Sequence, residues 1–288
     1  MAIILDGKAL SLQYKGEIRE QAKELTEKGC RPGLAVVLVG ENPASKIYVR
    51  NKEKDCGECG IYSAMYHLPE ATTEKDLLDL LNFLDYESSI HGILVQLPLP
   101  KHINTQRIIE AINPIKDVDA FHPTNVGYLT QGAPRFTPCT PAGIMRFMDS
   151  YHIDPAGKHC VVIGRSDIVG KPMALLLLQR NGTVTVCHSY TKDLKAQTLQ
   201  ADILISAVGK PGFVTADMVK DGAVVIDVGM NRNAEGKLCG DVDFAAVSQK
   251  ASAITPVPGG VGLMTRVMLL ENTLAACRWQ RFGEEPVK

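Results

Sequence analysis

The stretch His159-Cys-Val-Val-Ile-Gly164-Arg165-Ser166-Asp-Ile-Val169-Gly170-Lys-Pro172 decides the fold of the C-terminal half of the chain. An apolar run typical of a buried strand leads into a loop with two glycines, and a helical pattern follows. Such a loop lets the backbone approach a pyrophosphate, which rests on the unpaired N–H groups of the helix N-terminus. Ser166 replaces the second glycine of the general pattern G-x-G-x-x-G, so a tight turn without a ligand is the alternative. The stretch predicts a Rossmann-like unit that binds a dinucleotide.

The end of the next predicted strand indicates which dinucleotide is bound. NAD-binding units usually place an Asp or Glu there to hold the ribose 2′-hydroxyl. This chain has Cys187-His188-Ser189-Tyr190 instead. Together with Arg165, these residues offer a cation and a hydroxyl donor without a carboxylate, which suits a 2′-phosphate. His188 and Ser189 could also serve only as a strand end and a helix cap, but the pattern favours NADP over NAD.

Apolar runs alternate with helical patterns along the rest of the chain, which indicates parallel sheets covered on both faces. We therefore expect an α/β fold of two α/β lobes with a cleft between them, the C-terminal lobe being a Rossmann-like NADP-binding parallel sheet. Residues 98–141 hold seven of the sixteen prolines and form the expected connector. The predicted domains are 1–139, joined by the C-terminal helix 264–288, and 140–263. Strands are expected at 34–40, 62–68, 92–97, 159–164, 183–188, 203–209 and 223–230, helices at 9–28, 43–59, 74–85, from 140, and at 264–281, and a hairpin loop at 233–236.

Composition narrows the class of protein. The chain has 288 residues, 45% of them hydrophobic and 22% charged, with a net charge of −1. A balanced charge without like-charged blocks argues against nucleic acid or an anionic membrane as a partner. The N-terminus has no signal-peptide pattern and no apolar stretch reaches membrane-spanning length, so we expect a cytoplasmic protein. The eight cysteines are scattered, and Cys56-x-x-Cys59 lacks the second pair of a zinc ribbon, so no metal site is predicted.

The N-terminal lobe holds a second set of polar residues. Ser45, Tyr48 and Lys52 are spaced i, i+3 and i+7, so on a helix they share one face. Gln96 lies at the end of an apolar strand, where open α/β sheets place ligand groups. Asp117 and Asp119 lie in the connector. Taken singly, these residues are ordinary surface side chains or, for the two aspartates, Asx-turn residues.

The segment Thr255-Pro-Val-Pro-Gly-Gly-Val-Gly262 precedes the last helical pattern. Its prolines stiffen the chain, and its glycines permit positive φ and close approach to a ligand. A loop that needs three glycines in four positions favours ligand contact over a plain connection.

Together these stretches resemble the bifunctional methylenetetrahydrofolate dehydrogenase/methenyltetrahydrofolate cyclohydrolase family, known as FolD in bacteria. The resemblance covers essentially the whole chain, and six motifs occur in the family's order. They are Gly40-x-Asn-Pro-Ala-Ser45-x-x-Tyr48-x-x-x-Lys52, Gly92-Ile-Leu-Val-Gln-Leu-Pro-Leu-Pro100, Lys116-Asp-Val-Asp119, Gly164-Arg-Ser-x-Ile-Val-Gly-x-Pro172, Val208-Gly-Lys-Pro-Gly212 and Ile254-Thr-Pro-Val-Pro-Gly-Gly-Val-Gly262.

The resemblance implies an oxidoreductase and hydrolase of one-carbon metabolism, in tetrahydrofolate interconversion and purine biosynthesis. It would oxidise 5,10-methylenetetrahydrofolate with NADP and hydrolyse the methenyl product to 10-formyltetrahydrofolate in one shared active site. Tyr48 would stack on the folate, Lys52 would be the acid/base group tuned by Gln96, and Asp119 would hold the pterin-like ring. The implied catalytic residues are Lys52, Tyr48, Gln96 and Asp119. The implied substrate-binding residues are Tyr48, Ser45, Gln96, Leu97, Pro98, Asp119, Pro256, Val257, Pro258, Gly259 and Gly260. The implied cofactor-binding residues are Gly164, Arg165, Ser166, Val169, Gly170, His188, Ser189, Ala207, Val208, Gly209 and Gly229.

Two positions depart from the family pattern. Ala120 stands where a Gly usually follows Asp-Val-Asp, and Leu263 stands where a Pro usually follows Gly-Gly-Val-Gly. These changes affect the expected substrate affinity and the balance of the two activities more than the function. The alternatives are a folate- or NADP-binding protein without turnover, and another two-lobed NADP-dependent dehydrogenase. The resemblance also implies a homodimer formed through the cofactor lobes, with the hairpin near residues 233–236 as one element of its interface.

Overall fold

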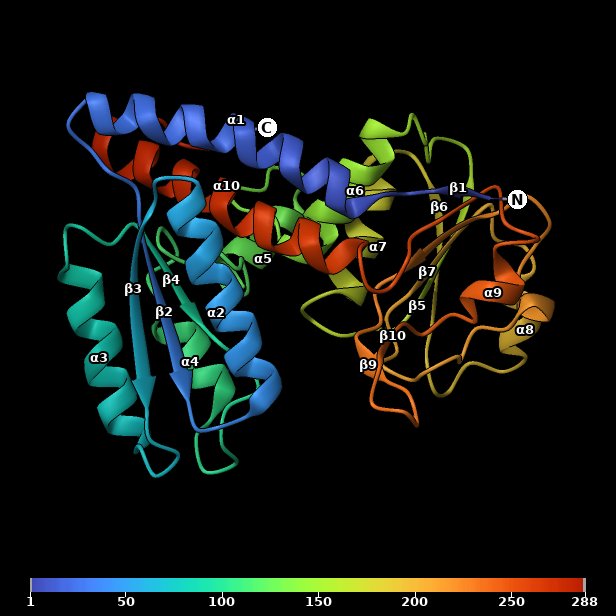
Figure 1. Ribbon diagram of the computed structural model, residues 1–288, viewed down its shortest axis with the longest axis horizontal. Helices are drawn as coiled ribbons and strands as arrows, with labels where there is room; N and C mark the ends of the chain where they lie inside the picture. The colour runs from blue at the N-terminus through green and yellow to red at the C-terminus, as the bar shows by residue number, and fades with distance from the viewer. Residues whose placement is uncertain (1, 287–288) are drawn as a thin grey trace. The chain divides into compact units, whose positions relative to one another are not determined.

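The computed structural model describes residues 2–286, which fold into two compact α/β units (Figure 1). Unit 1 comprises the residues up to Leu12 together with Cys139–Thr265. Unit 2 comprises Gln13–Pro138 and the residues from Arg266 onward. Both units have the α/β architecture that the alternating pattern predicts.

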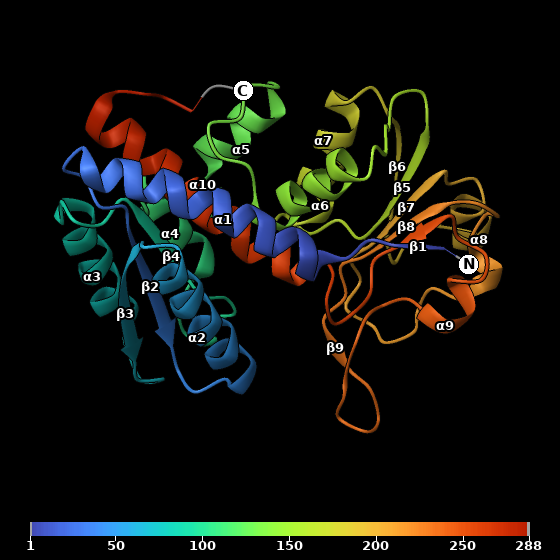
Figure 2. The same ribbon diagram turned by 45° about the horizontal axis from the view of Figure 1, so that its top comes forward.

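Unit 1 is built on a six-stranded parallel sheet with the order β1-β11-β8-β7-β5-β6. Figure 2 shows α6 and α7 on one face of this sheet and α8 and α9 on the other. The core contains residues of the sheet, such as Val161 and Leu204, packed with Val247 of α9. The elements are β1 (Ile3–Ile4), α6 (Cys139–Ser150), β5 (His159–Ile163), α7 (Gly170–Gln179), β6 (Thr183–Cys187), α8 (Leu194–Thr198), β7 (Ile203–Ser206), the 3₁₀ helix η1 (Ala216–Met218), β8 (Val224–Asp227), α9 (Phe244–Val247) and β11 (Ala253–Ile254).

The strand order of unit 1 reverses at β5. The chain goes from β5 to its neighbour β6 and then crosses to β7 on the other side of β5. Open α/β sheets bind ligands outside the carboxyl ends of the strands at such a switch point. The fold therefore directs attention to the residues that follow β5, β6 and β7.

Unit 2 contains a three-stranded parallel sheet with the order β3-β2-β4. Alternate residues of β2, including Val37, pack with Leu81 of α3 and Ile108 of α4 in one apolar cluster, and α2 packs against β2 and β3. The elements are α2 (Pro43–Glu58), β2 (Gly33–Val39), β3 (Tyr62–Leu68), α3 (Glu74–Tyr86), β4 (Gly92–Val95), α4 (Thr105–Ala111) and α5 (Pro123–Thr130). Two long helices, α1 (Gly7–Glu27) and α10 (Val261–Phe282), continue from one unit into the other.

The proline-rich connector is more regular than its weak periodicity indicates, because it contains α4 and α5. Asn104 caps α4 by accepting from the backbone N–H groups of Gln106 and Arg107. His122 caps α5, and Pro123 occupies the first turn, where its missing N–H costs nothing. These helices have seven and eight residues, too short to show a clear helical period.

Three further local features bear on the predictions from the sequence. The expected hairpin is present, as β9 (Asn231–Arg232) pairs antiparallel with β10 (Leu238–Cys239). Residues 1–12 were expected in the first domain, whereas β1 pairs with β11 in unit 1; a two-residue strand has no periodicity to reveal it. Ala120 adopts φ 60°, a conformation that glycine takes without strain.

Candidate active site

The start of α2 places the first group of polar residues in unit 2. The side chain of Asn42 accepts hydrogen bonds from the backbone N–H groups of Ala44 (3.0 Å) and Ser45 (3.1 Å), and Pro43 lies in the first turn. This cap fixes where the helix begins, and therefore which face carries Ser45, Tyr48 and Lys52. Ser45 and Lys52 are buried and Tyr48 is half-buried. Burial raises the pKa of the Tyr48 phenol, opposed by the charge of Arg266, so the ring stays neutral and suited to stacking.

Lys52 meets Gln96, which follows the last residue of β4. The Lys52 ammonium donates to Oε1 of Gln96 at 3.0 Å. The amide Nε2 of Gln96 donates to the carbonyl oxygen of Leu97 at 2.8 Å, and the backbone N–H of Gln96 donates to Val37 in β2. The amide is thereby held at both ends, with its oxygen toward Lys52. The contact expected from the resemblance is present, and it joins a helix to the carboxyl end of a strand.

A buried ion-pair group, which the sequence reading missed, anchors the next turn of α2. Asp55 is buried and forms ion pairs with Lys15 and, through Oδ2, with Arg266 at 3.0 Å. Asp55 lies three residues after Lys52, on the same side of the helix. The pairs tie α2 to α1 and α10 within unit 2, and so help to fix the position of Lys52.

The two aspartates of the Lys-Asp-Val-Asp motif have different environments. Asp117 is buried and accepts from the backbone N–H groups of Phe121 and His122 and from the amide of Asn125 at 2.8 Å. Burial raises the pKa of Asp117 despite these donors. Asp119 is half-buried and lines a small hollow with Leu97. Asp117 thus organises the loop, while Asp119 lies at the hollow.

In unit 1, Arg165 and Ser189 lie at the carboxyl ends of adjacent strands. Ile163 of β5 pairs with Cys187 of β6, so Arg165 and Ser189 each follow the paired residues by two positions. Both are exposed. The Arg165 guanidinium lies 5.6 Å from the centre of the Tyr190 ring. A cation and a hydroxyl donor thus follow adjacent strands, and these are the residue types expected for a 2′-phosphate.

The loop after β5 is as compact as a pyrophosphate-binding turn must be. Gly164 has φ 126°, and a Cβ built on it would lie 2.5 Å from the carbonyl oxygen of Ala207. No other residue fits that space. The hydroxyl of Ser166 accepts from the backbone N–H groups of Val169 (3.2 Å) and Gly170 (3.3 Å). The residue that breaks the general glycine pattern therefore caps the start of α7.

A pair of buried carboxylates, also missed by the sequence reading, holds the loops after β7 and β8. Asp241 accepts from the backbone N–H groups of Val208 (2.7 Å), Gly209 (3.3 Å) and Lys210 (2.9 Å), and also from Asn231 and Ser206. Asp227 accepts from the N–H groups of Gly229, Asp241 and Val242, each at 2.9 Å. Burial, with the nearby charge of Asp241, raises the pKa of Asp227 to about 6. A carboxylate at the end of the apolar run of β8 was the only sequence signal.

These two carboxylates position predicted cofactor residues without being exposed to a ligand. Val208, Gly209 and Gly229 are all held by them. A Cβ on Gly229 would lie 2.3 Å from Oδ1 of Asp241, so the glycine is needed for this close approach. The eleven predicted cofactor residues all lie in unit 1, in the segments that follow β5, β6, β7 and β8. Their chemistry fits a dinucleotide that carries a 2′-phosphate.

The segment Pro256–Gly260 also belongs to unit 1 and follows β11. The Val257–Pro258 peptide bond is cis and Gly259 has φ 108°. A Cβ on Gly260 would lie 2.5 Å from the carbonyl oxygen of Pro256. The glycines therefore close a tight turn.

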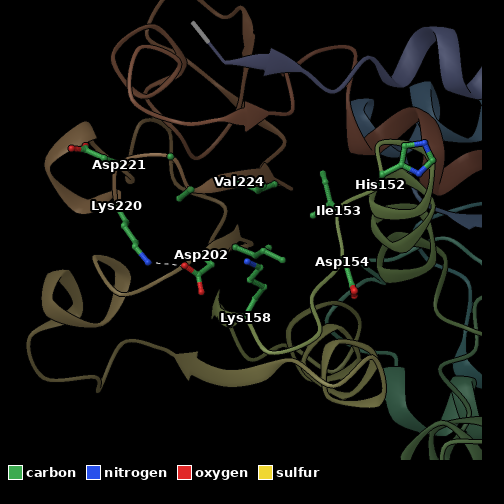
Figure 3. Close-up of a pocket in the computed structure, with 11 residues that line it drawn as sticks. His152, Ile153, Asp154, Lys158, Asp202, Lys220, Asp221 and Val224 are labelled. Carbon is green, nitrogen blue, oxygen red and sulfur yellow. Dashed lines mark hydrogen bonds and ion pairs between the residues drawn. The ribbon is translucent and has the colours of Figure 1, made fainter.

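A separate pocket of unit 1 lies at the opposite end of the sheet, where β5, β7 and β8 begin (Figure 3). Lys220 and Asp202 form an ion pair of 2.6 Å across it. Its other charged side chains, including Lys158 and Asp221, are exposed. The amino ends of the strands are not where such sheets bind cofactors, so this pocket is not part of the candidate site.

Comparisons with known proteins agree with this geometry. Residues 5–119 match the family profile described as tetrahydrofolate dehydrogenase/cyclohydrolase, catalytic domain, and residues 138–281 match its NAD(P)-binding domain. The chain is 61% identical to a bifunctional protein FolD of a Polaromonas species, over 95% of this chain and 97% of that protein. Among solved structures, the bifunctional FolD of Campylobacter jejuni has 54% identity and a TM-score of 0.95, covering 97% of this chain and 100% of that one. The Trypanosoma brucei enzyme, solved with NADP and an inhibitor, has 39% identity and a TM-score of 0.93, covering 97% and 98%.

Proposed function

The chain belongs to the tetrahydrofolate dehydrogenase/cyclohydrolase family, and we propose that Lys52 carries the proton transfers of its hydrolytic step. The two activities are the NADP-dependent oxidation of 5,10-methylenetetrahydrofolate to 5,10-methenyltetrahydrofolate and the hydrolysis of that product to 10-formyltetrahydrofolate. The single observation that carries the proposal is the hydrogen bond of 3.0 Å from the buried Lys52 to Gln96.

The oxidation requires positioning more than proton transfer. NADP, when bound, accepts the hydride that leaves the methylene carbon, and the two flanking nitrogens of the folate stabilise the cation that remains. The contribution of the protein is therefore to hold its two ligands at the distance and orientation that the transfer needs. In this proposal Tyr48 stacks on the folate, Asp119 accepts from its polar ring edge, and Ser45, Leu97 and Pro98 line the substrate in unit 2.

The hydrolysis requires a group that both takes and returns a proton. Water adds to the methenyl carbon and loses a proton, and the C–N bond then opens as the departing nitrogen gains one. A neutral Lys52 amine takes the proton of the attacking water and delivers it to that nitrogen. Burial and a cationic substrate both favour the neutral amine. The carbonyl oxygen of the Gln96 side chain accepts a hydrogen bond from the amine and adds no charge.

For the cofactor, we propose that Arg165, Ser189 and His188 bind the 2′-phosphate. Gly164, Ser166, Val169 and Gly170 form the pyrophosphate turn, and Ala207, Val208, Gly209 and Gly229 line the remainder of the cofactor. For the folate substrate, we propose contacts with Pro256, Val257, Pro258, Gly259 and Gly260. The compact glycine turns support this assignment.

The variant Lys52→Met tests the hydrolytic role. Methionine keeps the length and packing of a buried side chain but has no ionisable group. We expect it to abolish hydrolysis of added methenyltetrahydrofolate, followed by the loss of its absorbance, while NADP still binds. Lys54→Met is the matched control, because Lys54 lies on the same helix and is exposed. Normal hydrolysis by Lys52→Met would remove Lys52 from the mechanism.

We also propose that the protein acts in the cytoplasm as a homodimer formed through unit 1. Among residues 2–286, no helix is long and apolar enough to cross a membrane. The β9–β10 hairpin projects exposed residues such as Arg232 from the sheet unit, which supports a role at the interface. Analytical ultracentrifugation of the wild-type chain and of a variant with the hairpin tip shortened measures the oligomeric state.

A further inference from the structure

Three buried side chains of unit 2 form a cluster that the proposed mechanism does not use. Cys30 lies between α1 and β2, His91 directly precedes β4, and Cys277 lies in α10. Their exposed fractions are 7%, 2% and 0%. The two sulfurs are 3.1 Å apart, and the Cys30 sulfur is 3.4 Å from Nε2 of His91. Segments far apart in the sequence thus bring two thiols and an imidazole into contact.

The surroundings of His91 favour one position for the proton of its ring. The backbone N–H of Gly33 donates to Nδ1 at 3.1 Å, and β2 holds that N–H in place. A neutral imidazole that accepts at Nδ1 has its proton on Nε2. The Nε–H of Arg281 also faces the ring, at 3.4 Å from Nε2. Because the Gly33 contact is the shorter of the two, we assign the proton to Nε2, which lies 3.4 Å from the Cys30 sulfur. Burial, with the charges of Arg281 and Lys116, lowers the pKa of His91 to about 4, so the ring is neutral near pH 7.

This tautomer and the sulfur spacing both argue against a metal ion in the cluster. Metal-ligating histidines donate a proton from their other nitrogen, whereas Nδ1 of His91 faces a donor. A tetrahedral zinc ion with Zn–S bonds of about 2.3 Å separates two sulfurs by about 3.8 Å, which is wider than the 3.1 Å found here. The guanidinium of Arg281 also lies 3.4 Å from Nε2, where it would repel a cation.

The same groups distinguish the two thiols. Cys30 lies 3.4 Å from Nε2 of His91, whereas the charges of Arg281 and Arg278 act on Cys277. Burial and the contact with Cys30 raise the pKa of Cys277 despite these two charges. Cys30 is also the more exposed of the two. Cys30, the more exposed sulfur and the one beside the imidazole, is therefore the sulfur that an oxidant reaches first, and Cys277 is the sulfur that then attacks it.

We propose that Cys30 and Cys277 form a reversible oxidation site whose oxidant is a small hydroperoxide. The Cys30 thiolate attacks a peroxide oxygen: an S–O bond forms, the O–O bond breaks, and the released hydroxide takes a proton to become water. The Cys277 sulfur then attacks Cys30, so that the S–S bond forms, the S–O bond breaks, and the sulfenic oxygen leaves as a second water with the Cys277 proton. Two thiols and one hydrogen peroxide thus give one disulfide and two waters, and a dithiol reductant returns the two electrons.

The bond would cross-link two segments 247 residues apart in the sequence. Cys277 belongs to α10, which also carries Arg266, the ion-pair partner of Asp55 in α2. The disulfide would fasten α10 to the start of β2 and restrict the unfolded chain, as long closed loops do. The expected consequence is a more stable unit 2 under oxidising conditions, without a change in any group placed in the catalytic machinery.

The test uses the full chain, reduced with dithiothreitol, freed of it, and treated with a small excess of hydrogen peroxide. We expect a loss of two hydrogen masses, a Cys30–Cys277 linked peptide in a non-reducing digest, and a thermal midpoint several degrees higher that dithiothreitol reverses. Cys56 and Cys59 are the internal control, because burial raises the pKa of their thiols to about 12 and about 11. They should remain free thiols.

Two variants separate chemistry from packing. Cys277→Ala should lose the linked peptide and stop at an oxidised Cys30, while Cys30→Ser should react at neither position. Free Cys30 and Cys277 thiols after peroxide treatment of the wild-type chain overturn the proposal, and so does a disulfide that joins other cysteines. Stoichiometric zinc that copurifies with the wild-type chain and is lost in Cys30→Ser also overturns it, in favour of a metal site.

Discussion

The variant Gln96→Glu tests the tuning of Lys52 by a measurable charge effect. The substitution keeps the shape of the side chain and replaces a neutral acceptor by a carboxylate at the same place, 3.0 Å from the Lys52 ammonium. Two unit charges at that distance attract by about 5.5 kcal/mol at an effective dielectric constant of about 20. Since Gln96 is half-buried, water screens the pair, and we take about half of that value, roughly 2.7 kcal/mol.

This attraction stabilises the ammonium and depletes the neutral amine. An energy of about 2.7 kcal/mol corresponds to a decrease of about 100-fold in the neutral population. Hydrolysis of methenyltetrahydrofolate at neutral pH should therefore fall about 100-fold and should recover as the pH is raised. The oxidation, which needs no proton from Lys52, should be much less affected.

The assay is the pH dependence of both activities in the wild type, Gln96→Glu and Gln96→Met. The methionine variant removes the acceptor without adding a charge, so it isolates the electrostatic contribution. A pH profile of hydrolysis that is identical in wild type and Gln96→Glu refutes the role of neutral Lys52. Equal losses in the Glu and Met variants would show that the amide acts by positioning alone.

Three further predictions concern cofactor binding and stability. Arg165→Ala should raise the KM for NADP by about one to two orders of magnitude, the value of a charged hydrogen bond of about 1.5–3 kcal/mol, and leave the KM for NAD unchanged; a wild type that prefers NAD contradicts it. In Asp241→Asn, the new amide NH2 group should face at least two of the five donors that now bond to the carboxylate. The loss of these hydrogen bonds should lower the free energy of unfolding by about 2–6 kcal/mol. The variant should also raise the KM for NADP and lower the pKa of Asp227. Urea titration measures the stability, kinetics the KM and NMR the pKa, and Asp243→Asn, at an exposed position, is the control. The pKa of His91 is lowered to about 4 from an ordinary 6.5, so its contribution to stability is complete above pH 6.5 and is lost as the pH falls toward 4. Urea titrations at pH 7 and 4.5 should show this loss of stability in the wild type and a smaller loss in His91→Asn. Equal losses in the two proteins would contradict the prediction.

The long helices and strands could be predicted from the sequence because their hydrophobic patterns extend over many residues. The strand expected at 62–68 is β3 without change, and the helix expected at 43–59 is α2 to within one residue. Predicted strands overran their ends, as 203–209 did for β7 (Ile203–Ser206). The overrun has a physical cause: apolar and glycine residues continue past the last ladder hydrogen bond into the loops at the carboxyl ends of the strands. Short elements such as β1 and α4 carry too few residues for a period.

The candidate site was predictable where its residues belong to motifs, and not where they act through the backbone. Lys52 and Gln96 were expected to meet and do so. Asp241 was not identified, because its role is to accept N–H groups from residues more than thirty positions earlier. Only the folded chain shows that pairing. The cluster of Cys30, His91 and Cys277 was hidden for the same reason, since its members come from three distant segments.

The motif Lys116-Asp-Val-Asp119 shows how burial assigns roles that a motif leaves open. Lys116 is buried and donates to the carbonyl oxygens of Leu84, Asp85 and Glu87, so it closes the end of α3. Asp117 takes the N–H groups that follow it, and its own loop carries Ala120 at φ 60°. Lys116 and Asp117 therefore hold the backbone around the motif, and Asp117 and Asp119 both line the hollow beside Leu97. Ala120 adopts this positive φ without being a glycine, and the hydrogen bonds that the buried Asp117 accepts from the N–H groups of Phe121 and His122 hold the backbone directly after it.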